Sequence, residues 1–202
     1  LASELNQDAV QLRIDLLQNV KETKDKNIQY SGKRMEETIR LAAEKGGWGN
    51  AKVGVFQGFS AYYSHNTHVA ELAEVELKNG LPVVKKVIAA VDCGILVNPT
   101  GAINQVQGGV IDGIGHAMYG DLTFTDGKPS NKNFDTYRLI RMNETPQVEV
   151  HFVKNELSPT GLGEPGLPPA GGAVANAIFK AVGKRIYKQP FIHQIEKDKI
   201  VG

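Results

Sequence analysis

Two alternating segments joined by a short turn constrain the fold of this chain more than any other feature. Segment 69–77 alternates between two sides, as a half-buried strand does, and segment 83–91 is apolar and rich in valine. Asn79 and Gly80 lie between them. An Asn-Gly pair between two such runs is a strong short-range signal for a β-hairpin. The sequence therefore predicts an antiparallel pair of strands over residues 67–91.

Two helices are predicted ahead of these strands. Segments 8–19 and 33–45 repeat apolar residues at helical spacing, and the charged segment 21–32 between them is typical of a solvated linker. Strands and helices then follow in a mixed order, which favours the α+β class with a mixed or antiparallel sheet and packed helices. We expect residues 1–50 to form a helical arm that packs against structure outside this chain. Residues 51–202 are expected to form one compact α+β unit.

A glycine-rich helix is predicted after Asn98-Pro99 and runs to about residue 119. Asn is a favoured N-cap, and Pro is tolerated at the first helical position. Interior glycines each cost roughly 1 kcal/mol relative to Ala, so we expect close backbone packing to compensate. There are four of them: Gly108, Gly109, Gly113 and Gly115.

Glu164 is the leading candidate for chemistry. It lies in segment 158–170, which is rich in glycine and proline and must form a loop before a small-residue helix over 171–182. Glycines such as Gly163 allow close approach of the backbone, and the prolines stiffen the loop. A carboxylate on a rigid loop can act as a positioned general base. The alternative is a capping or surface glutamate, since carboxylates near helix starts are routine.

Two glutamines, Gln105 and Gln107, lie in the glycine-rich helix. An amide both donates and accepts hydrogen bonds, which suits the edge of a pterin or a nucleotide. By pattern alone an exposed helix face is the preferred alternative. Other polar residues are interpreted as structural or as ordinary surface groups: His65, His68, Glu71, Glu74, Asp92, Cys93 and His116.

Composition excludes several classes. The 202 residues contain 23 Lys and Arg against 22 Asp and Glu, a net charge of +1, so nothing favours nucleic acid as a partner. The single cysteine cannot supply the four thiolates of an iron–sulfur cluster. No apolar run reaches the roughly 20 residues of a transmembrane segment. The start on Leu1, without Met, suggests a fragment, and the compartment stays open between cytoplasm and periplasm.

Two long motifs carry a specific resemblance. VDCGILVNPTGAINQVQGGVIDGIG (91–115) and TGLGEPGLPPAGGAVANAIFKAVGKRI (160–186) resemble the molybdenum-binding subunits of the xanthine dehydrogenase and aldehyde oxidase family. Upstream pieces such as RLAAEKGGWG (40–49) are similar too, and the nearest likeness is to the isoquinoline 1-oxidoreductase beta-subunit type. The resemblance covers nearly the whole chain and implies the C-terminal half of a molybdopterin-binding domain.

The resemblance implies roles for three residues. Glu164 matches the active-site glutamate of the family's Gly-Glu-Pro motif, which acts as the general base that activates a metal-bound nucleophile. Gln105 matches a glutamine that hydrogen-bonds the pterin, and Gly163 is assigned to the cofactor beside it. No residue of this chain is assigned as a metal ligand. The implied reaction is hydroxylation of an N-heteroaromatic or an aldehyde.

The resemblance also implies partners. Family subunits are several times longer, so molybdopterin with Mo, whose dinucleotide form is left open, would be held mainly by regions outside this chain. The [2Fe-2S] clusters would belong to a separate small subunit. The isolated chain is then expected to be inactive. The alternative is a catalytically silent assembly domain that binds the rest of the subunit. Substrate identity, electron acceptor and oligomeric state are not indicated by the sequence.

Overall fold

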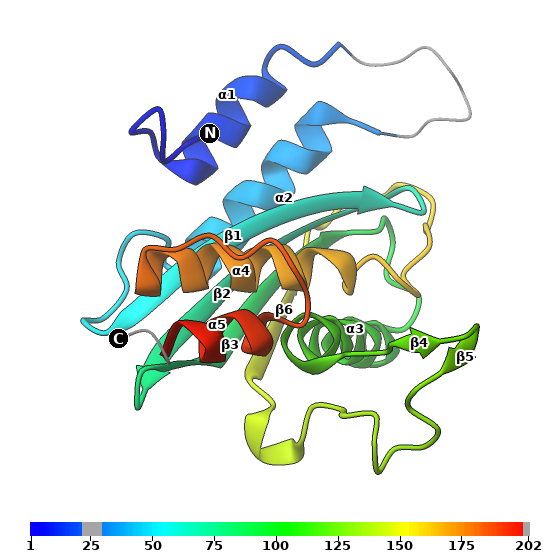
Figure 1. The fold of residues 1–202 in the computed structure, drawn as a ribbon. Coiled ribbons are helices and arrows are strands. Elements are labelled where there is room, and N and C mark those ends of the chain that lie inside the picture. The colour runs from blue at the N-terminus through cyan, green and yellow to red at the C-terminus, as the bar shows by residue number, and fades with distance from the viewer. Residues whose placement is uncertain (22–29, 200–202) are drawn as a thin grey trace.

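The computed structural model describes residues 1–21 and 30–199, which form a mixed four-stranded sheet with helices on both faces (Figure 1). β1 and β2 are antiparallel, as are β2 and β3, whereas β6 pairs in parallel with β3. The predicted α+β class with a mixed sheet is confirmed. In sheet order the strands are β1 (Val55–Ser64), β2 (Thr67–Lys78), β3 (Leu81–Asp92) and β6 (Gln147–Phe152).

Two tight turns connect the first three strands. Asn79 and Gly80 both have positive φ, 53° and 73°, and join paired residues of β2 and β3. His65 and Asn66, with φ of 52° and 61°, connect β1 to β2 in the same way. Positive φ at both central residues is the mark of the hairpin turn that matches strand twist. The predicted hairpin over residues 67–91 is confirmed, and a second hairpin extends it by one strand.

Helices α1 (Ala9–Leu17) and α2 (Gly32–Lys45) cover one face of the sheet, and both predicted helices are confirmed. The predicted linker lies mostly outside the described residues. The apolar side chains of α1 and α2 pack on β2 and β3 through Ile14, Ile39 and Ile88, among others. The arm therefore packs against this chain's own sheet, and its expected contact with structure elsewhere stays a prediction. The division of the chain at residue 50 stays a prediction.

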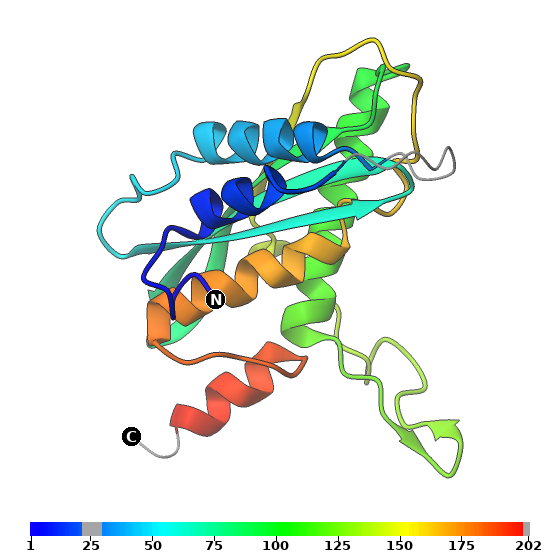
Figure 2. The same cartoon turned by 90° about the horizontal axis from the view of Figure 1, so that it is seen from above.

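Helices α3 (Pro99–Tyr119), α4 (Pro168–Val182) and α5 (Phe191–Lys199) cover the opposite face (Figures 1 and 2). α4 comes so close to β1 that a Cβ on Gly58 would lie 2.1 Å from the amide nitrogen of Ala177. α3 begins as predicted, with the Asn98 side chain accepting from the Gly101 amide at 3.0 Å. α4 ends as predicted at Gly183, whose φ is 71°.

The remaining elements lie between α3 and β6. β4 (Phe124–Thr125) and β5 (Lys128–Pro129) form a small hairpin that projects from the body (Figure 1). Each of these two strands is only two residues long. A short 3₁₀ helix, η1 (Met142–Glu144), precedes β6. Among the helices of the described ranges, none is both long and apolar enough to cross a membrane.

Candidate functional site

The predicted base lies on the loop that connects β6 to α4. Glu164 is exposed there, and its carbonyl oxygen accepts a hydrogen bond from the Leu167 amide at 2.8 Å, which closes a turn into α4. The side-chain amide of Gln105 donates to the carbonyl oxygen of Gly163 at 2.6 Å. The structure therefore brings together three residues that the sequence singled out in two separate motifs.

Backbone contact with α3 holds the turn at residues 164–167. A Cβ on Gly113 would lie 2.3 Å from the carbonyl oxygen of Leu167, and one on Gly109 would lie 3.4 Å from the Leu167 amide. Gly115 lies similarly close to Ile140, whereas Gly108 has no atom within 4 Å of that position. The expected close packing of the glycine-rich helix is confirmed at three of its four glycines. The turn at residues 164–167 is one of the segments that pack closely against these glycines.

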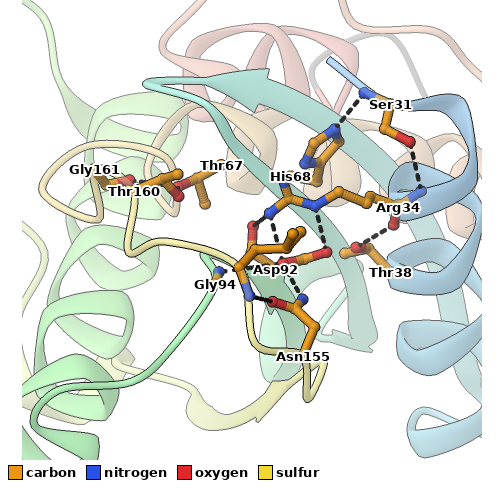
Figure 3. A network of polar contacts seen from close by, with 11 residues as sticks. Ser31, Arg34, Thr38, Thr67, His68, Asp92, Gly94, Asn155, Thr160 and Gly161 are labelled. Atoms are coloured by element: carbon orange, nitrogen blue, oxygen red, sulfur yellow. Dashed lines mark hydrogen bonds and ion pairs between the residues drawn. The ribbon is translucent and has the colours of Figure 1, made fainter. Parts of the chain in front are cut away.

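The turn between β1 and β2 holds the loop from the other side (Figure 3). The Thr67 hydroxyl donates to the carbonyl oxygen of Gly161 at 2.6 Å and contacts the Thr160 hydroxyl at 2.7 Å. The Gly161 amide donates to the backbone carbonyl oxygen of His65 at 3.1 Å, and the Thr160 amide donates to that of Cys93 at 3.0 Å. The loop is thus fixed just ahead of Gly163.

A buried ion pair supports the start of the same loop (Figure 3). Asp92, at the end of β3, accepts from two nitrogens of Arg34 at 2.8 and 2.7 Å, and from Asn155 at 2.9 Å. The Asn155 oxygen accepts in turn from the Leu157 amide. Burial acts to raise the pKa of Asp92, but the hydrogen bonds from Arg34, Asn155 and the Gly94 amide outweigh it and hold that pKa below its usual value. Sequence reasoning treated Asp92 as an ordinary carboxylate and missed this network.

A small cleft opens between the loop and the start of α3. Its volume is about 340 Å³, and Gln105 and Gly163 lie on its wall. A Cβ on Gly163 or on Gly108 would meet no atom within 4 Å. The open backbone at Gly163 and the exposed amide of Gln105 could therefore contact a bound group at one edge. These few contacts fit one edge of a pterin cofactor and could not enclose all of it.

The other candidates have structural contacts. The Gln107 amide donates to Val148 at 3.0 Å and so ties α3 to β6 instead of facing the cleft. His68 accepts from the Ser31 amide at 3.2 Å. Cys93 is buried, and burial raises the pKa of its thiol. Over residues 1–21 and 30–195, no group of three or more His, Cys, Asp or Glu could hold a metal ion.

Comparison with known proteins identifies the class that this fold and loop define. The family model described as molybdopterin cofactor-binding domain matches residues 2–146, and this chain belongs to that family. The match ends before the loop that bears Glu164. Members of the family are molybdenum oxidoreductases, as the resemblance predicted.

Two relatives align with almost all of the chain. One is the isoquinoline 1-oxidoreductase subunit beta of Brevundimonas diminuta, 28% identical over 197 residues, which cover 94% of this chain and 24% of that protein. Another is a membrane-bound aldehyde dehydrogenase [pyrroloquinoline-quinone] of Gluconacetobacter polyoxogenes, 28% identical over 204 residues, which cover 94% of this chain and 26% of that protein. The chain thus spans about a quarter of the length of these relatives.

Solved structures share the fold. Quinoline 2-oxidoreductase from Pseudomonas putida 86 superposes with a TM-score of 0.61 at 20% identity, over 67% of this chain and 19% of that one. The aldehyde oxidoreductase of Desulfovibrio desulfuricans gives a TM-score of 0.58 at 23% identity, over 65% of this chain and 15% of that one. At these identities the likeness establishes the arrangement of the elements alone.

Proposed function

We propose that this chain forms the base-bearing part of the active site in a molybdopterin-dependent hydroxylase. The observation that carries the proposal is the 2.6 Å hydrogen bond from Gln105 to Gly163, directly beside Glu164. It joins two motifs 58 residues apart at one cleft. The chain supplies this part of the site, and the rest of a longer large subunit supplies most of the cofactor contacts.

Glu164 is the proposed general base. Its carboxylate is exposed and forms no ion pair with any described residue, so it is free to accept a proton. The turn to Leu167 and the bond from Gln105 fix the backbone on both sides of it. Glu164 would take a proton from the group that attacks the substrate, while the neighbouring backbone holds the carboxylate in place. When bound, the molybdenum cofactor supplies the two-electron oxidation.

Gln105 and Gly163 are the residues that we assign to the cofactor, because both line the cleft. The family favours molybdopterin, while one relative bears pyrroloquinoline quinone in its name. Molybdopterin, as either the nucleotide-free or the dinucleotide form, is therefore the proposed group, with the [2Fe-2S] clusters on a small partner subunit. Relatives named for isoquinoline, nicotinate and aldehyde oxidation support an N-heteroaromatic or aldehyde substrate.

The test is Glu164→Gln in the complete large subunit with its partner. We expect molybdenum and pterin content to match wild type and turnover to fall by at least about 100-fold, the usual scale for removing a general base. Glu156→Gln is the matched control, because Glu156 is an exposed glutamate of the same loop. Near-normal turnover in the Glu164 variant would reject the base, and a subunit free of molybdenum and pterin would reject the enzyme class in favour of an assembly domain.

Cofactor contact is tested with Gln105→Ala in the same subunit. Loss of the bond to Gly163 should weaken cofactor retention during gel filtration, measured as molybdenum per subunit. Retention equal to wild type would remove Gln105 from the cofactor. The isolated 202-residue chain is expected to show no turnover, since most of the cofactor contacts would be missing.

A further inference from the structure

A second groove lies far from the proposed base, at the free edge of β1. Its volume is about 800 Å³. α1 and α4 reach this edge from opposite faces of the sheet (Figure 2). The groove is lined by the last turns of α4, whereas Glu164 precedes its first turn. Pro168 and Lys180 are twelve positions apart on α4, which separates the two places by roughly 18 Å of helix.

A chain of polar contacts holds two arginines at this edge. The outward carbonyl oxygen of Phe59 accepts from Asn176 at 3.0 Å and from Arg13 at 3.5 Å. Arg185 donates to the side-chain oxygen of Asn176 at 2.9 Å. The Phe59 carbonyl therefore binds Arg13 of α1 directly and holds Arg185, which follows α4, through Asn176. Because this carbonyl of β1 already accepts two hydrogen bonds, a partner would contact side chains here instead of pairing with the strand backbone.

Lys180 is a third cation that lines the groove. The Lys180 ammonium lies 4.1 Å from the centre of the Trp48 ring. The nearby Asp8 carboxylate already accepts from two α1 amides and from the Trp48 ring nitrogen. Within residues 1–21 and 30–195, no carboxylate forms an ion pair with Arg13, Lys180 or Arg185. Burial lowers the pKa values of Arg13 and Lys180 although Asp8 acts to raise them, so both cations lack full compensation.

Exposed apolar groups border the same cations. Leu16 and Tyr187 line the groove with exposed fractions of 57% and 85%. Arginine, tryptophan and tyrosine beside exposed apolar surface are the residues that dominate the energy of protein interfaces. The composition favours a macromolecular partner. Three cations line the groove against the two carboxylates of Glu4 and Asp8, and none of the three forms an ion pair with a described carboxylate, which favours acidic groups on that partner.

We propose that this groove is the docking site for an acidic segment of the remaining part of the large subunit. The chain spans about a quarter of the relatives that it matches, so most of a subunit of that kind lies outside it. One or more Asp or Glu side chains of that segment would pair with Arg185 and Lys180, and Tyr187 would pack beside them. The inference rests on the assembly part of the proposed function and is independent of Glu164 as base.

A photo-crosslinking residue placed at Tyr187 in the complete large subunit tests the occupant. We expect a cross-link to a peptide that contains Asp or Glu and lies outside these 202 residues, identified by mass spectrometry. The same probe at Phe134, an aromatic residue that is also exposed, controls for photoreactivity. A cross-link only to a second copy, to another subunit, or within these 202 residues would overturn the proposal, as would no cross-link at Tyr187.

Charge reversal tests the chemistry. Lys180→Glu with Arg185→Glu should lower the yield of that cross-link about tenfold, the scale of losing two partly exposed ion pairs. Lys128→Glu with Lys132→Glu, on the exposed segment near β5, should leave it unchanged. If the first variant fails to fold, Lys180→Gln with Arg185→Gln provides the same comparison. Unchanged yield in a folded variant would reject docking, whereas Glu164→Gln should affect turnover and leave the cross-link intact.

Discussion

The two faces of the sheet hold their helices by different means. On the α2 side, large apolar side chains pack between the helices and the sheet, and Arg34 of α2 forms an ion pair with Asp92 at the end of β3. On the α4 side, small residues bring backbone against backbone, as at Gly58 and Ala177. Each face also buries one carboxylate. Asp92 accepts four side-chain and backbone donors, whereas neither oxygen of Glu71 has a hydrogen-bond partner in the described structure.

The surroundings of Glu71 explain the contrast. It lies between Val69 and Ala73 on β2, with Ser60 and Ala89 as its cross-strand neighbours. Burial raises the pKa of Glu71 well above its usual value, because no cation or donor compensates the charge. The α2 face is thus stabilised by a buried anion, while the α4 face tolerates its acid only in the neutral form. The negative charge of Asp92 stabilises the α2 face, whereas a negative charge on Glu71 would destabilise the α4 face.

Asp92→Asn should have the largest effect on this contrast. It leaves the Arg34 guanidinium, only 13% exposed, without its counter-charge. Breaking one partner of a buried pair costs about 3–5 kcal/mol, measured as the free energy of unfolding in urea. Asp135→Asn, at an exposed position, is the control and should stay within about 0.5 kcal/mol of wild type. A loss below about 1 kcal/mol for Asp92→Asn would show that apolar contacts alone hold this face.

Acid should destabilise the α2 face through His68. Burial, with a smaller contribution from Arg34, lowers the pKa of this ring to about 4. The ring of the unfolded chain titrates near pH 6.5. The stability that depends on a neutral His68 is therefore fully present above that pH and is lost as the pH falls from 6.5 through 4. The loss is at most about 3 kcal/mol. His68→Gln should reduce the change in the free energy of unfolding between pH 7 and pH 4. A pH dependence equal to that of wild type would contradict the lowered pKa of His68.

The backbone contacts of the α4 side are tested by a matched pair of glycines on α3. Gly113→Ala would push a methyl group against the Leu167 carbonyl and should cost about 1–3 kcal/mol. Gly108→Ala points into open space and should stabilise the helix by about 0.5–1 kcal/mol. Thermal unfolding of both variants measures the difference. Equal effects would mean that the turn after Glu164 does not depend on this contact.

Glu71→Gln should give a change that is close to zero at pH 4 and grows with pH. The unfolded carboxyl ionises near pH 4.3, whereas the folded one ionises only at higher pH, so wild type loses stability as the pH rises between the two values. The variant lacks this loss and should gain about 1.4 kcal/mol per pH unit within that window. Urea unfolding at pH 4 and pH 8 measures it, with the exposed Glu76→Gln as control. A gain equal at both pH values would argue against a buried neutral acid.

Local signals predicted much of the fold. The Asn79-Gly80 turn, the Asn98 cap and the helix end at Gly183 each depend on backbone preferences within a few residues. α5 was missed, although Phe191 and Ile195 have helical spacing and both are buried. The parallel pairing of β6 with β3 was also missed, since nothing in either strand specifies a partner some 60 residues away.

The resemblance selected residues that lie together in the structure, whereas polar partners that meet only through the fold were missed. Gln105 and Gly163 were chosen by resemblance, and the structure places them in contact. Arg34 and Asp92 are 58 residues apart, on a helix and a strand end, and neither has a local pattern that identifies it. Strand alternation places Glu71 on the same side of β2 as Val69 and Ala73, but only the packing of α4 shows that it is fully buried.

The bond between Thr67 and Thr160 links residues 93 positions apart. During synthesis at 5–20 residues per second, the Thr67 hydroxyl would wait about 5–20 seconds for its partner to leave the ribosome. Arg34 meets Asp92 earlier, so the α2 layer can close while the later part of the chain is still being made. The loop bearing Glu164 can close only after that, which makes the candidate site a late product of folding and a sensitive reporter of its completion.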